Sequence, residues 1–158
     1  MIFACVGTQF PFERMMDSLA TWKSRNAGTE IIAQVGKGGR YHDGIECFET
    51  LEKASFDAIQ QRASLIVSHA GMGSIISALC SGIPIVLVPR LAELKEHRND
   101  HQVATAKSMS DRPGVVVAWN DEELFSALDR RSELTSGLRL SPYAPAALTD
   151  ELRRLALE

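Results

Sequence analysis

The sequence lacks both a long apolar run and a block of basic residues. A transmembrane helix needs about 20 consecutive apolar residues, and no stretch of this 158-residue chain approaches that length. The formal net charge is −3 at pH 7, so we expect no nucleic-acid partner. Any membrane association is therefore expected to come through a partner or a surface patch.

Cysteine is scarce and is not arranged for metal binding or disulfide exchange. The three cysteines, Cys5, Cys47 and Cys80, lie in or beside apolar stretches, and none has CxxC spacing to another. Reduced, buried cysteines of this kind are typical of a cytoplasmic protein. The first expected strand starts at Met1, so we also expect no signal peptide.

Several motifs of nucleotide-dependent enzymes are also absent. The chain has no GxxxxGK[ST] P-loop. The pair Gly71-x-Gly73 lacks the rest of the dinucleotide fingerprint and the acidic residue expected about 20 positions later. The sequence also lacks Asp-x-Asp, with which many sugar transferases hold a divalent ion. These absences disfavour an ATPase, a dehydrogenase and a metal-dependent transferase.

What the chain does contain is an alternation of apolar strands and helices, long enough for one domain with a sizeable core. We expect strands at 2–6, 30–35, 45–48, 65–68, 85–88 and 115–118, with helices between them that include 73–81 and 98–109. This alternation predicts an α/β fold, a Rossmann-like parallel sheet with helices on both faces. We take 1–158 as a single domain, with 136–158 as a C-terminal loop and amphipathic helix.

Four polar or glycine-containing segments follow the expected strands. They are Gly7-Thr8, Gly36-Lys37, 68–74 and 90–102. Ligands of parallel sheets bind outside the carboxyl ends of the strands. These segments are far apart in the sequence but would share one rim, and this convergence indicates a binding site better than any single loop does.

The most informative of these segments is 68–74, Ser-His-Ala-Gly-Met-Gly-Ser, between an apolar strand and a helix. Backbone N–H groups at a helix start are unpaired and lie at the positive end of the helix dipole. Glycine lets an anion approach them closely, so the turn predicts a phosphate or nucleotide site. His69 is either a packed polar residue or a catalyst, and Ser74 either caps the helix or donates to a phosphate.

A second polar cluster lies further along the chain. His97, Asn99, Asp100, His101 and Gln102 fall within six residues and offer the donors and acceptors that sugar hydroxyls need. The alternative is a solvated loop entering a helix, with Asn99 or Asp100 as its cap. A metal site is less favoured, because no further His or Cys lies nearby to join His97 and His101.

Together these motifs resemble the C-terminal domain of family 28 glycosyltransferases, which are GT-B enzymes that bind a UDP-sugar. The resemblance rests on 68–74, on Gly-Ile-Pro at 82–84 and on Asn-Asp-His-Gln at 99–102. It extends from Val6-Gly7-Thr8 through Gln34-Val35-Gly36 to about Trp119. The segment 90–102 is especially similar to small, free-standing donor-binding subunits, the PssE-like subunits of exopolysaccharide synthesis and the catalytic subunit of the dolichol-linked GlcNAc transferase.

The resemblance implies roles for individual residues. Gly7 and Thr8 would face the diphosphate, 71–74 would hold its phosphates, and residues near Phe48 would flank the uracil ring. His101 and Gln102, aided by Asn99, would bind hydroxyls of the donor sugar. The full implied donor-binding set is Gly7, Thr8, Gln34, Phe48, Gly71, Met72, Gly73, Ser74, Ser77, Asn99, His101 and Gln102.

One position departs from the family pattern. Relatives often carry Asp or Glu one turn into the helix to bind the ribose, and this chain has Ser77 there. The resemblance then implies that ribose recognition is weaker here or has moved to another residue.

A full GT-B enzyme also has a second Rossmann-like half that binds the acceptor. The resemblance therefore implies a separate, membrane-anchored subunit that binds a lipid-linked acceptor and holds this chain at the inner face of the membrane. The helix expected at 146–157 is a candidate docking element, although it could equally pack on its own domain.

The implied reaction is an inverting transfer from a UDP-sugar without a metal or other cofactor. Candidate bases within the chain are His69, Glu96 and His97. The alternative function is a non-catalytic partner that stimulates a separate, complete glycosyltransferase.

Overall fold

The structure is a computed structural model that describes residues 1–137, 139–141 and 143. Strands and helices alternate along this part of the chain, as predicted. They are β1 (Ile2–Cys5), α1 (Glu13–Arg25), β2 (Ile31–Gln34), β3 (Glu46–Phe48), α2 (Lys53–Arg62), β4 (Leu65–His69), α3 (Met72–Ser81), β5 (Ile85–Val88), α4 (His101–Met109), β6 (Val115–Val117) and α5 (Asp121–Asp129). The helix expected at 146–157 lies outside the described residues.

The strands form one sheet in the order β3-β2-β1-β4-β5-β6. Every neighbouring pair is parallel, so the prediction of a Rossmann-like parallel sheet is confirmed. The connections run outward in opposite directions from β1 and β4. A sheet that reverses its strand order in this way leaves a crevice at the carboxyl ends of the two strands.

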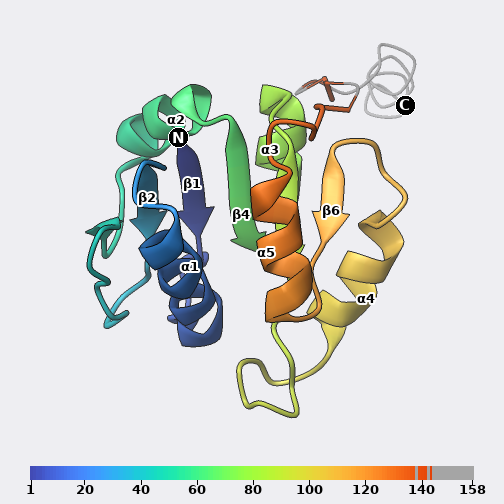
Figure 1. The fold of residues 1–158 in the computed structure, drawn as a ribbon. Coiled ribbons are helices and arrows are strands. Elements are labelled where there is room, and N and C mark those ends of the chain that lie inside the picture. Colours follow the sequence, from blue (N-terminus) through green and yellow to red (C-terminus); the bar gives the residue numbers. More distant parts are fainter. Residues whose placement is uncertain (138, 142, 144–158) are drawn as a thin grey trace, which may run out of the picture.

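Helices cover both faces of the sheet (Figure 1). The side chains of α1 and α5 join one core cluster with Ile2 and Ala4 of β1. On the opposite face α3 and α4 share a second cluster with β4 and β5, while Phe3 and Cys5 pack with α2. This division follows from the two-residue repeat of a strand, which sends alternate side chains to opposite faces. No helix in the described part of the chain has both the length and the hydropathy of a bilayer-spanning segment.

The start of α4 differs from the expectation. The helix begins at His101 and not at 98, and residues 92–100 form turns and bends. The Asp100 carboxylate accepts a hydrogen bond from the Ala92 N–H at 2.9 Å. Short polar side chains that bond to nearby backbone compete with helix formation, so this loop stays outside the helix and lies at the rim of the sheet.

Candidate functional site

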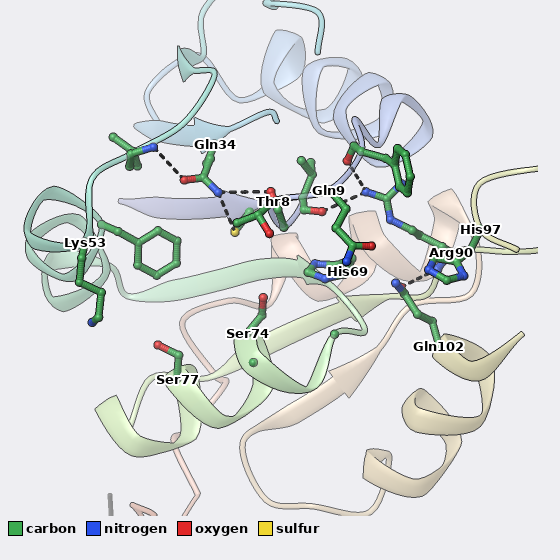
Figure 2. Close-up of a pocket in the computed structure, with 18 of the residues that line it drawn as sticks. Thr8, Gln9, Gln34, Lys53, His69, Ser74, Ser77, Arg90, His97 and Gln102 are labelled. Carbon is green, nitrogen blue, oxygen red and sulfur yellow. Dashed lines mark hydrogen bonds between the residues drawn. The ribbon is translucent and has the colours of Figure 1, made fainter. Parts of the chain in front are cut away.

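A pocket of about 610 Å³ lies at the carboxyl ends of β1, β4 and β5 (Figure 2). This is the edge of the sheet at which the sequence analysis predicted a binding site. Most of the predicted site residues line it: Gly7, Thr8, Gln34, His69, Gly71, Gly73, Ser74, Ser77, His97, His101 and Gln102. Four predicted residues, Phe48, Met72, Glu96 and Asn99, are not part of this lining.

The start of α3 faces the pocket without a cap. Gly71 precedes the helix, and no side chain caps its first turn. The Ile75 N–H bonds to the Gly71 carbonyl at 3.1 Å, which leaves the N–H groups of Met72, Gly73 and Ser74 in the unpaired first turn. This arrangement suits an anion. Met72 is not itself part of the lining, and its side chain is exposed.

The His69 ring lies between two glycines of the pocket wall. A Cβ on Gly7 would lie 2.8 Å from its Cε1 atom, and a Cβ on Gly71 would collide with its Nε2 atom. Gly7 also has a positive φ of 88°, which side chains rarely adopt. At these two positions glycine makes room for the histidine, whereas a Cβ on Gly73 would meet nothing within 4 Å.

Hydrogen bonds around Ser68 set the protonation of His69. The buried Ser68 hydroxyl donates to the Cys5 carbonyl at 2.8 Å, so its oxygen is left to accept from His69 Nδ1 at 3.2 Å. The proton is thereby assigned to Nδ1, and Nε2 is an acceptor. Burial, and then the charge of Arg90, lower the pKa of His69 from 6.5 to about 4, so the ring is neutral at pH 7.

We expect His69 to make the free energy of unfolding fall as the pH drops from about 6.5 toward about 4. In this window the unfolded chain binds a proton at His69 that the folded chain does not, so acid favours unfolding. Denaturant unfolding at about pH 7 and about pH 5 measures the loss. The loss should be smaller in His69→Gln than in the unmodified chain; equal losses would contradict a neutral, buried His69.

Arg90 holds the loops at the rim together. It is only 3% exposed, and its guanidinium donates to the carbonyls of Pro11 and Phe10 at 2.7 Å each and of Val6 at 3.0 Å. It also stacks over the Phe12 ring, 4.5 Å from the centroid. The turn that carries Gly7 and Thr8 is therefore positioned by a residue from the end of β5.

Glu96 braces the same rim from outside the pocket. Arg14 binds both of its carboxylate oxygens, at 2.7 and 2.9 Å, and the Leu91 N–H donates to it at 2.9 Å. The carboxylate is thus held by partners within the chain. The candidate role of Glu96 as a base stays a prediction.

One end of the pocket carries imidazole and amide groups. The rings of His97 and His101 meet edge to face, with centroids 4.3 Å apart. The buried Nδ1 of His97 has no hydrogen-bond partner among the described residues. Gln102 accepts from the Arg90 N–H at 3.1 Å, which leaves its NH₂ group for a ligand. Asn99, just outside the lining, accepts from the ring and the backbone of His101 and so orients it.

The other end is lined by residues that the sequence analysis missed. They are Leu51 and, from α2, Lys53, Phe56 and Asp57. The sequence analysis assigned no role to this segment. The position of α2 in the chain could have indicated its role. Because α2 follows β3, its first turns lie at the carboxyl edge of the sheet, where ligands bind. Phe48, near which the uracil ring was expected to lie, is outside the pocket lining and packs beside the core cluster of Phe3.

Gln34 lies at the floor between these ends. It is 4% exposed and donates to the Gly7 carbonyl at 3.3 Å, while its Oε1 accepts from the Leu51 N–H at 3.0 Å. Gln34 therefore ties two pocket walls together. Burial raises the pKa of the neighbouring Cys5 thiol, which keeps the thiol protonated and unreactive.

The described residues include one group that could hold a metal, and it lies outside the pocket lining. It consists of Glu13, Asp17 and His42. Arg40 already pairs with both carboxylates, at 2.7 Å each, so its positive charge offsets one of their two negative charges. The expectation of a metal-free site stays a prediction.

Comparison with known proteins identifies the family. The sequence model of the glycosyltransferase family 28 C-terminal domain matches residues 1–131. The chain belongs to this family. The family predicted from the sequence is thus confirmed, as is the correspondence to the C-terminal half of a GT-B glycosyltransferase.

A relative from Porphyromonas gingivalis is the UDP-N-acetylglucosamine–N-acetylmuramyl-(pentapeptide) pyrophosphoryl-undecaprenol N-acetylglucosamine transferase. It is 28% identical over 150 residues, which are 89% of this chain but 36% of that enzyme. The chain thus spans about a third of the length of this curated relative.

Two solved structures share the fold. The NMR solution structure of ALG13 superposes with a TM-score of 0.61 at 16% identity, over 96% of this chain and 93% of that one. The Streptomyces glycosyltransferase SsfS6, solved with thymidine diphosphate, gives a TM-score of 0.59 at 19% identity, over 99% of this chain and 36% of that one.

Proposed function

We propose that this chain is the donor-binding subunit of an inverting glycosyltransferase. It binds a UDP-sugar, and the sugar passes to a lipid-linked acceptor in the synthesis of an exopolysaccharide or another glycan. The observation that carries the proposal is the pocket at the carboxyl ends of β1, β4 and β5, with the uncapped α3 facing it. This pocket lies in a chain of family 28.

The start of α3 supplies the diphosphate site. The N–H groups of Met72, Gly73 and Ser74, with the Ser74 hydroxyl and Thr8 nearby, are donors for the phosphate oxygens. When the bond to the sugar breaks, negative charge grows on the leaving diphosphate. Amides and a helix dipole that already point at it stabilise this charge without a metal ion.

The sugar itself is assigned to the end of the pocket that carries His97, His101 and Gln102. These side chains provide ring nitrogens and an amide for hydroxyl groups. The nucleoside then extends to the opposite end, beside Leu51 and Phe56. His69, whose Nε2 is an acceptor, lies between them as a candidate base.

The acceptor half is proposed to be a separate, membrane-anchored protein. The lipid-linked acceptor is supported by the name of the P. gingivalis relative, which couples UDP-N-acetylglucosamine to an undecaprenol-linked acceptor. ALG13 is a solved chain of nearly the same extent. The complex would hold this subunit at the inner face of the membrane, with the catalytic base supplied by either half.

Thermal unfolding with added nucleotides tests the proposal. UDP and UDP-sugars should raise the Tm of the purified chain, whereas ADP, GDP and NAD should not. A ligand at 100 times its Kd stabilises the folded state by about 2.7 kcal/mol, a shift that calorimetry resolves easily. Equal or no stabilisation by UDP compounds would contradict a uridine nucleotide site within this chain.

A further inference from the structure

The pocket contains a single acidic side chain among its described lining residues, Asp57 on α2. It pairs with Lys53 one turn earlier on the same helix. Figure 2 shows Lys53 and Ser77 at one end of the pocket and His97 and Gln102 at the other. The carboxylate therefore belongs to the end opposite the imidazole groups.

The Asp57 carboxylate is held only loosely. Its partner Lys53 is 86% exposed and Asp57 itself 41% exposed in their side chains. Such i,i+4 pairs in solvent contribute little, so a ligand can replace the lysine without a large cost. A carboxylate has two acceptor oxygens and no donor, which matches two adjacent hydroxyl groups, each donating one hydrogen bond.

Other polar groups at this end have partners within the chain, and of these the Ser77 hydroxyl oxygen can still accept a hydrogen bond beside Asp57. The Ser77 hydroxyl donates its proton to Gln60 Oε1 at 3.0 Å, and Gln60 donates in turn to the Ser77 carbonyl at 3.1 Å and to the Ser81 hydroxyl at 2.7 Å. Gln34 Oε1 accepts from the Leu51 N–H. The bonds of the buried Gln60 also keep α2 and α3 in register, so Asp57 has a defined position relative to the start of α3.

The wall beside Asp57 is apolar. Leu51 and Phe56 line the pocket, and the Phe56 ring is set by an edge-to-face contact with Phe3, with centroids 5.0 Å apart. A flat apolar surface next to a loosely paired carboxylate suits a ring system that carries a vicinal diol. A ribonucleoside combines these two features.

We infer that Asp57 binds the 2′- and 3′-hydroxyls of the donor ribose and selects ribonucleotides over 2′-deoxyribonucleotides. The inference rests on the proposed function, since it assumes that a uridine nucleotide occupies the pocket. Asp57 is then a specificity residue contributed by α2, while the phosphates are held by α3.

Calorimetric titration with UDP and with 2′-deoxy-UDP tests the inference. The unmodified chain should bind UDP at least about tenfold more tightly than 2′-deoxy-UDP, because the deoxynucleotide lacks the hydroxyl that donates a charge-assisted hydrogen bond to Asp57. In Asp57→Ala this preference should fall to about twofold or less. Alanine is a good helix former, so the variant keeps α2 and loses only a weak surface pair.

The ratio of the two affinities is the decisive readout, because a general change in charge affects both ligands alike. Glu52→Gln is the matched control: it removes one negative charge at the start of α2 from a side chain outside the pocket lining, and the preference should persist. A preference that survives in Asp57→Ala, or that the unmodified chain lacks, overturns the inference and leaves the proposed function standing. Failure of the unmodified chain to bind either nucleotide overturns both.

Discussion

Replacing Gly73 with Trp should weaken UDP binding at least about 100-fold, or about 2.7 kcal/mol, without unfolding the protein. Gly73 lines the pocket, and a Cβ there would meet nothing within 4 Å, so the chain itself has room for a side chain. An indole at this position fills the space in front of the α3 amides and excludes the diphosphate. Calorimetric titration gives the affinity, and the Tm reports on the fold.

Ile76→Trp is the matched control for this experiment. Ile76 lies on the same helix, is 47% exposed and does not line the pocket, so UDP affinity should be unchanged. Undiminished UDP binding by Gly73→Trp would place the nucleotide elsewhere. In the reconstituted transferase, a donor subunit should lose transfer with Gly73→Trp, whereas a partner that only stimulates a complete enzyme would keep it.

Replacing Arg90 with Met should lower the free energy of unfolding by about 3–5 kcal/mol, the range for breaking a buried, hydrogen-bonded charge network. Methionine preserves much of the side-chain volume but donates no hydrogen bond. The carbonyls of Val6, Phe10 and Pro11 would lose their donor, and each buried carbonyl left unsatisfied costs about 1–3 kcal/mol. Urea unfolding measures the change.

Arg40→Met serves as the control for Arg90→Met. Arg40 also binds carboxylates, those of Glu13 and Asp17, but its side chain is 60% exposed. Exposed ion pairs contribute about 0–1 kcal/mol, so this variant should lose far less stability. Similar losses in the two variants would show that the bonds of Arg90 do not brace the rim.

The glycine turn illustrates how far local sequence reasoning extends. The pattern predicted a glycine turn and a helix start after a buried strand and left open whether Ser74 caps the helix; in the structure no side chain caps α3. Glycine was interpreted as room for an anion, yet at Gly7 and Gly71 the glycine also makes room for the His69 ring. The contact with Gly7 joins two turns more than 60 positions apart, so no local pattern contains it.

The walls of the pocket also differ in whether the sequence alone could predict them. The rim loops after β1, β4 and β5 were predictable, because the carboxyl ends of parallel strands share one edge. The wall from α2 was not predicted, because a polar helix pattern shows only that one face meets solvent. Whether Phe56 and Asp57 turn toward the pocket depends on how α2 packs on β1 and β2.

The sequence by itself determined the order of strands and helices, the edge of the sheet that carries the site, and the family. These follow from apolar periodicity and from motifs that are local in the chain. The tertiary structure alone decided which polar side chains remain for a ligand. Glu96 is bound by Arg14, 82 positions away, while His97 and Asp57 face the pocket. Hydrogen-bond partners distant in sequence meet only after folding, and they separate bracing residues from those free to bind.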